Sequence, residues 1–166
     1  MPINKIENKD ELHPDDFEYN YNADLTRELD ENNGDFNRSI INTITLWKVN
    51  RYPYVSEDII AELNKIRNDT EYREEHKILL LKLLACKGLQ LPMASTFLRF
   101  RNPKLFQIID QRVYRLLKGI ELSLPIHNSP TNREIICDVY FDYLKTLKAK
   151  CRELQIPFEK SDRYPP

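Results

Sequence analysis

The sequence is poor in residues that mark several protein classes, since only three of its 166 residues are glycine and three are cysteine. Scarce glycine excludes collagen-like and low-complexity chains and, with abundant Leu, Ile, Lys and Glu, favours helix. The odd set Cys86, Cys137 and Cys151 is too widely spaced for a disulfide framework or a zinc motif. The longest apolar stretch, residues 78–84, is interrupted by Lys82 and is shorter than the roughly 20 residues that span a bilayer.

Motifs of the common nucleotide-binding and hydrolytic sites are also missing. The patterns GxxxxGK[ST], GxGxxG, GxSxG and HExxH do not occur, so those classes lose their sequence support. His13, His76 and His127 are far apart, and we expect no metal site. The acidic start lacks the apolar core of a secretory signal. We therefore expect a cytoplasmic protein with no membrane partner and no redox or organic cofactor.

Charge is distributed unevenly along a chain whose net charge is −1. Residues 1–35 carry eleven acidic side chains against three basic ones, whereas residues 82–118 carry eight basic side chains against one acidic. The net charge argues against a nucleic-acid partner, because such domains are usually basic. The local excess of positive charge in residues 82–118 argues for a nucleic-acid partner, because cations beside helix N-termini bind phosphate. A solvated helix surface would explain the same charges.

Hydrophobic periodicity predicts an all-α fold, a compact helical bundle over residues 36–156. An acidic, partly ordered segment (1–35) precedes it and an irregular tail (157–166) follows. The expected helices lie at about 36–49, 56–67, 71–84, 93–100, 110–118 and 131–154. Expected boundary signals are caps at Ser56 and at Thr131 with Glu134, Pro92 at a first helical position, and helix ends at Gly88 and Gly119.

Two stretches in the basic region resemble a known family. Residues 84–95 read LACKGLQLPMAS, and residues 106–117 read FQIIDQRVYRLL. They resemble the core of the helix–hairpin–helix DNA glycosylases of base-excision repair. That family has a Gly-hydrophobic-Gly hairpin between two helices, then a hydrophobic-hydrophobic-Asp segment that opens an Arg-rich helix. The 22 residues from Gly88 to Asp110 match the family's spacing.

The resemblance implies that duplex DNA is the partner and that hairpin amides contact a phosphate, with a monovalent cation held by hairpin carbonyls. The implied DNA-binding residues are Lys87, Gly88, Leu89, Gln90, Leu91, Pro92, Arg112 and Arg115. Asp110 matches the family's catalytic Asp at the mouth of a pocket for a flipped-out base. A fixed carboxylate there would stabilise positive charge on the sugar as the damaged base leaves.

The sequence also departs from the family. Gln90 replaces the second hairpin glycine, which changes how closely the turn approaches a phosphate. Pro92 stands near the position of the lysine that lyase members use, so we expect no lyase activity. Four closely spaced cysteines for an iron–sulfur cluster are missing. The hypotheses are a monofunctional glycosylase, a non-catalytic module that binds nucleic acid or a protein, and a purely structural helical domain. Asp110 is also a favoured helix N-cap residue.

Aromatic residues allow two interpretations. Arg99 and Arg101 flank Phe100, a pattern that suits nucleic-acid binding, but an aromatic at helical spacing is usually a core residue. We therefore expect Phe100 in the core, and we expect the same of Trp47. Tyr114 lies four residues after Asp110 and thus on the same helix face, where it would contact a ligand or pack.

Overall fold

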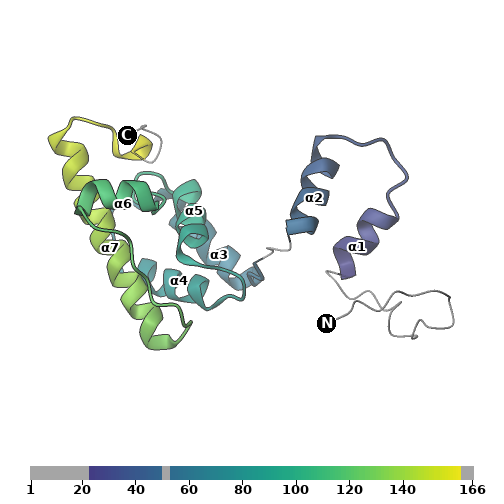
Figure 1. Ribbon diagram of the computed structural model, residues 1–166, viewed down its shortest axis with the longest axis horizontal. Coiled ribbons are helices and arrows are strands. Elements are labelled where there is room, and N and C mark those ends of the chain that lie inside the picture. The colour runs from purple at the N-terminus through teal and green to yellow at the C-terminus, as the bar shows by residue number, and fades with distance from the viewer. Residues whose placement is uncertain (1–22, 50–52, 162–166) are drawn as a thin grey trace, which may run out of the picture. The chain divides into compact units, whose positions relative to one another are not determined.

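The computed structural model describes residues 23–49 and 53–161 (Figure 1). Across these ranges it contains seven α-helices, two short 3-10 helices and no strand, which confirms the all-α prediction. The chain divides into two units, residues 1–52 and residues 53–166. We had expected the helical body to begin at residue 36. Most of the predicted acidic segment and the end of the predicted tail lie outside the described residues.

The first unit contains helices α1 (Ala23–Asp30) and α2 (Arg38–Val49). The indole N–H of Trp47 donates to the Thr26 hydroxyl at 2.9 Å and so joins α2 to α1. Trp47 is half-buried, and no residue of α2 is fully buried. Trp47 therefore contacts α1 but is not a buried core residue as expected, because this two-helix unit buries no residue of α2 completely.

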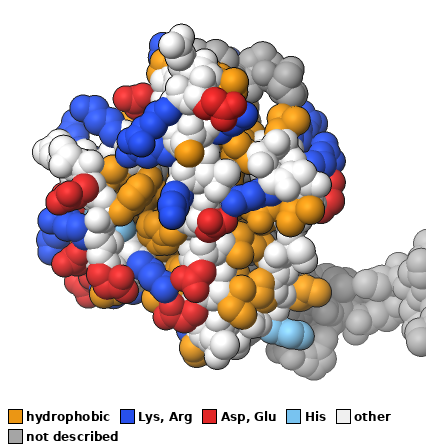
Figure 2. All heavy atoms as spheres, turned by 90° about the vertical axis from the view of Figure 1, so that its left-hand side faces the viewer, with side chains coloured by type: hydrophobic (Ala, Val, Ile, Leu, Met, Phe, Trp, Pro, Cys, Tyr) orange, Lys and Arg blue, Asp and Glu red, His pale blue; other side chains and the backbone are white. Residues whose placement is uncertain are grey.

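The second unit is built around the longest helix. It contains α3 (Glu57–Lys65), α4 (Glu74–Ala85), α5 (Leu91–Arg101), α6 (Gln111–Lys118) and α7 (Pro130–Glu153), with short 3-10 helices at Ile66–Asn68 (η3) and Phe158–Lys160 (η4). Helix α4 packs against α3, α5 and α7, and α6 packs against α7. Buried leucines of α4 and α5 meet the buried Tyr140, Tyr143 and Leu144 of α7. Figure 2 views this unit from the side on which α7 lies in Figure 1.

The segment between α5 and α6 is buried although it is neither helix nor strand. Leu105, Phe106 and Ile109 are at most 1% exposed. Its carbonyl groups are satisfied by α7, because the hydroxyl of Tyr140 donates to Gln107 O and that of Tyr143 donates to Ile108 O, both at 2.9 Å. These bonds fix the backbone just before α6.

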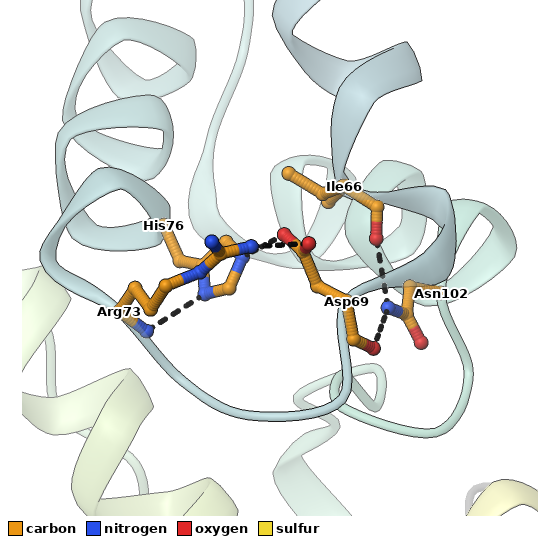
Figure 3. Close-up of polar contacts among 5 residues, drawn as sticks. All are labelled: Ile66, Asp69, Arg73, His76 and Asn102. Carbon is orange, nitrogen blue, oxygen red and sulfur yellow. Dashed lines mark hydrogen bonds and ion pairs between the residues drawn. The ribbon is translucent and has the colours of Figure 1, made fainter.

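A polar network joins the C-terminal end of α5 to the segment before α4 (Figure 3). The buried Asn102 side chain donates to the carbonyls of Ile66 at 2.8 Å and Asp69 at 2.9 Å. The Arg73 amide donates to Nδ1 of His76 at 3.1 Å, so the proton of the neutral ring lies on Nε2, which is 2.8 Å from the Asp69 carboxylate. The guanidinium of Arg73 also pairs with Asp69. The network ties η3, the start of α4 and the end of α5 together.

Several boundary predictions need correction. Helix α7 begins at Pro130, and its cap is Ser129, whose hydroxyl accepts from the Asn132 amide at 3.1 Å, not Thr131. The reason is that proline fits the first helical position and moves the start upstream. Helix α5 begins at Leu91, so Pro92 is its second residue. Gly119 ends α6 with a φ of +69°, as predicted.

We expect Asn102→Ala to lower the free energy of unfolding by about 1–3 kcal/mol, because two buried carbonyls lose their donor. Urea unfolding followed by far-UV circular dichroism measures this loss. Asn128→Ala is the matched control, since Asn128 is exposed and donates to one carbonyl, that of Leu84. Equal losses in the two variants would contradict the structural role of the buried amide.

Candidate nucleic-acid interface

The glycine of the predicted hairpin lies in a tight turn, which we call the interhelical turn (residues 86–90). The Leu89 amide donates to the Cys86 carbonyl at 3.2 Å, and Gly88 has a φ of +81°. This is the pattern of a type II turn with glycine at its third position. Gly88 was expected to end the preceding helix, but α4 ends at Ala85 and its C-cap is Cys86. Gly88 is therefore a turn residue.

The side chains around this turn have different roles. Leu89 and Leu91 are 4% and 2% exposed and anchor the turn in the core. Lys87 and Gln90 are exposed, and Gln90 is the N-cap of α5 without a side-chain capping bond. The Lys87 carbonyl accepts from the Tyr54 amide at 3.4 Å. The turn is thus held from inside, and its polar side chains face solvent.

Asp110 is the N-cap of α6, as its sequence context predicts. Its Oδ1 atom accepts from the amides of Arg112 at 2.8 Å and Val113 at 3.2 Å. Its side chain is exposed. The neighbouring Ile109 amide donates to the Ser95 hydroxyl at 3.2 Å, which brings the start of α6 against the second turn of α5. The structure therefore brings Asp110 close to the helix that follows the interhelical turn.

Most basic side chains of residues 82–118 have partners. Lys82 pairs with Glu62 at 2.6 Å, Arg115 with Glu121 at 2.9 Å, and Lys118 with Asp142 at 2.6 Å. Arg115 and Gln111 hold the pKa of Glu121 below its usual range by hydrogen bonding to it. Arg99 is 6% exposed and donates to the Glu159 carbonyl. Arg101 donates to the Asn64 carbonyl at 2.9 Å. The net positive charge that residues 82–118 present on the surface is therefore smaller than their sequence suggests.

Three exposed cations of this stretch have no ion pair with a described residue: Lys87, Lys104 and Arg112. Lys87 lies in the interhelical turn and Arg112 in the first turn of α6. Arg115, which the resemblance also places in the interface, is engaged by Glu121. The predicted interface is thus reduced to one free cation beside each of the two helix starts.

Two aromatic predictions have different outcomes. Phe100 is 67% exposed, so its assignment to the core was wrong. It extends from the last turn of α5 beside Arg99, whose guanidinium lies 5.1 Å from its ring centroid. Tyr114 stacks against Tyr143 of α7 with 6.2 Å between ring centroids. It is therefore a packing residue.

Sequence reasoning missed a surface pocket of about 540 Å³. It is lined by Tyr72, Phe141, Lys145, Lys148, Ala149 and Arg152, and we call it the aromatic-basic pocket. Asp110 does not line it. The signal in the sequence is the spacing of Phe141, Lys145, Lys148 and Arg152, which puts them on one face of α7. This face is distinct from the one that carries the buried Tyr140, Tyr143 and Leu144.

Comparisons with protein-family models, curated proteins and solved structures found no match to this chain. Within residues 23–49 and 53–161, no helix is long and apolar enough to cross a membrane. The same residues contain no cluster of three or more His, Cys, Asp or Glu side chains that could hold a metal ion.

We expect Asp110→Ala to lower the free energy of unfolding by about 0.5–2 kcal/mol, because two amides at the start of α6 lose their acceptor. Asp110→Asn should retain most of this stability, since asparagine caps helices about as well as aspartate. Urea denaturation of the two variants tests this. Equal losses for Ala and Asn would mean that capping is not the structural role of Asp110.

Proposed function

We propose that residues 53–161 form a DNA-binding module that contacts the phosphates of duplex DNA through the interhelical turn and the first turn of α6. One observation carries the proposal. The Ile109–Ser95 hydrogen bond brings the start of α6 against α5, which follows the turn, and each of these two starts bears an exposed cation, Lys87 or Arg112. Exposed cations attract phosphate, and at α6 the contact is made by the Arg112 side chain, because the Asp110 carboxylate already accepts from the amides of Arg112 and Val113. The resemblance to the helix–hairpin–helix glycosylases points to the same surface.

The non-catalytic form of this function has the stronger support. Asp110 is exposed and caps its own helix, whereas a carboxylate that stabilises a developing cation acts best in a pocket from which water is excluded. Arg115 is held by Glu121. Gln90 occupies a position at which the family has glycine, so its side chain limits how closely a phosphate approaches.

Base excision is a second candidate, and one observation favours it. Both capping bonds of Asp110 go to Oδ1, and Oδ2 accepts no hydrogen bond from any described residue. The cap therefore leaves one carboxylate oxygen for a substrate. On this proposal Asp110 would act without a redox or organic cofactor.

DNA binding is tested by fluorescence anisotropy of the full chain with a labelled duplex over a range of salt concentrations. We expect the affinity to fall as salt rises, because bound phosphates release counterions. The double variant Lys87→Ala/Arg112→Ala should weaken binding on all sequences and reduce the salt slope by about 2, which corresponds to two lost phosphate contacts.

The matched control is Arg67→Ala/Lys160→Ala, which removes the same two charges from exposed positions outside the proposed interface. It should leave the salt slope almost unchanged. If the control weakens binding as much as the first double variant, the turn and α6 are not the binding surface. If the wild-type chain does not bind duplex DNA at low salt, the proposed function is wrong.

Base excision is tested with duplexes that each carry one damaged base, by measuring release of the free base. The second candidate predicts release by the wild-type chain and its loss in Asp110→Asn, with duplex affinity retained because the helix cap is preserved. Wild-type protein that binds duplexes but releases no base from a broad panel would leave the non-catalytic function standing and eliminate the enzyme.

A further inference from the structure

The aromatic-basic pocket shares no residue with the proposed DNA-binding surface. Its helical residues, Phe141, Lys145, Lys148, Ala149 and Arg152, all come from the middle and the C-terminal part of α7. The face of α7 that meets α6 carries Asp142 and Thr146, both bound by Lys118. Figure 2 shows hydrophobic side chains in a hollow on the α7 side of the molecule, with Lys and Arg side chains beside them.

Two cations of the pocket differ from the lysines around α7 in having no ion pair within the described part of the chain. Lys77, Lys118 and Lys150 pair with carboxylates of this helix at 2.9, 2.6 and 2.7 Å. Lys145 and Arg152 are exposed and have no ion pair with a described residue. No carboxylate is among the six residues that line the pocket. The pocket is thus a concentration of positive charge in a chain whose net charge is −1.

The third cation is fixed in place by aromatic rings. The Lys148 ammonium lies 5.6 Å from the ring centroid of Tyr72 and 5.7 Å from that of Phe158. Contacts of this kind hold a cation by the negative face of each ring. Lys148 therefore needs little further ordering when an anion binds, which lowers the cost of binding.

The apolar floor of the pocket is also rigid. The Tyr72 ring meets the rings of Phe106 and Phe141 edge to face, at centroid distances of 5.9 and 6.0 Å. Its hydroxyl donates to the Leu105 carbonyl. Burial raises the pKa of Tyr72 to about 12, so the phenol is neutral at physiological pH. The floor is therefore a preformed apolar surface without negative charge.

From these observations we propose that the aromatic-basic pocket binds a nucleoside monophosphate. The flat base would cover the floor beside Phe141 and Ala149, and the phosphate would lie between the side chains of Lys145 and Arg152. Inorganic phosphate would leave the floor exposed, and a neutral apolar ligand would leave three cations without a counterion. The volume of about 540 Å³ falls within the roughly 300–1,000 Å³ of small-molecule sites. The inference does not rest on the proposed binding of duplex DNA.

The experiment titrates the full chain with AMP, adenosine, ribose 5-phosphate and inorganic phosphate by isothermal titration calorimetry. We expect AMP to bind more tightly than each of the other three, because only AMP uses both the floor and the cations. Binding of inorganic phosphate as tightly as AMP would overturn the proposal, since the floor would contribute nothing. Absence of AMP binding at millimolar concentration would overturn it as well.

Lys145→Ala should weaken AMP binding by about tenfold, the loss expected for one charged hydrogen bond. The matched control is Lys150→Ala, which removes the same charge from the same helix but from a lysine paired with Glu153 outside the pocket. Equal weakening in the two variants would overturn the assignment to this pocket. Circular dichroism verifies that both variants keep the wild-type helix content.

A nucleotide reaches such a pocket either free or as an unpaired residue of a single strand. Competition between AMP and an oligothymidylate distinguishes these sources. Displacement of AMP by the oligonucleotide at a lower concentration than by free TMP identifies a single strand as the source, and the reverse order identifies a free nucleotide. Both orders support the pocket. Oligonucleotide binding that does not displace AMP identifies a free nucleotide as the source.

Discussion

The second unit depends on how two buried carbonyl groups are satisfied. Gln107 and Ile108 lie in a segment that is neither helix nor strand, and their carbonyls accept from the hydroxyls of Tyr140 and Tyr143. A buried carbonyl without a donor costs on the order of 1–3 kcal/mol, so this pairing determines which face of α7 turns inward. The segment that it fixes leads directly into α6. Asp110 comes two residues after Ile108, so these two bonds also fix the backbone from which it extends.

Helices α2 to α7 could be predicted from the sequence because periodicity and local caps act within a few residues, whereas α1 (Ala23–Asp30) lies in the acidic segment for which no helix was expected. Asp110 and Gly119 begin and end α6 as expected, since both signals depend on local backbone conformation. The start of α7 was misplaced because Ser129 and Thr131 both offer capping hydroxyls two residues apart. Phe100 was misassigned because helical spacing does not reveal which turns of α5 extend beyond the neighbouring helices.

The candidate site was less predictable than the fold, because the carboxylates that neutralise its basic residues are distant in the sequence. Glu62 and Asp142 lie 20 and 24 residues from the lysines that they neutralise. No local pattern indicates such pairs, so a run of basic residues overstates the positive surface. The aromatic-basic pocket was missed for the same reason, since it is formed by residues far apart in the sequence. Tyr72 reaches Phe141 only because the loop before α4 packs against α7. Its cations could be placed on one helix face from sequence, but not its floor.

Trp47 gives the molecule an optical property of its own. It is the chain's one tryptophan, and its indole is held by Thr26 within the α1–α2 unit. The second unit holds its signal in tyrosines, including the buried Tyr140 and Tyr143. Excitation at the red edge of the absorption band therefore selects the unit that contains α1 and α2, since tyrosine does not absorb there. The chain thus carries a spectroscopic reporter of this unit without any added label.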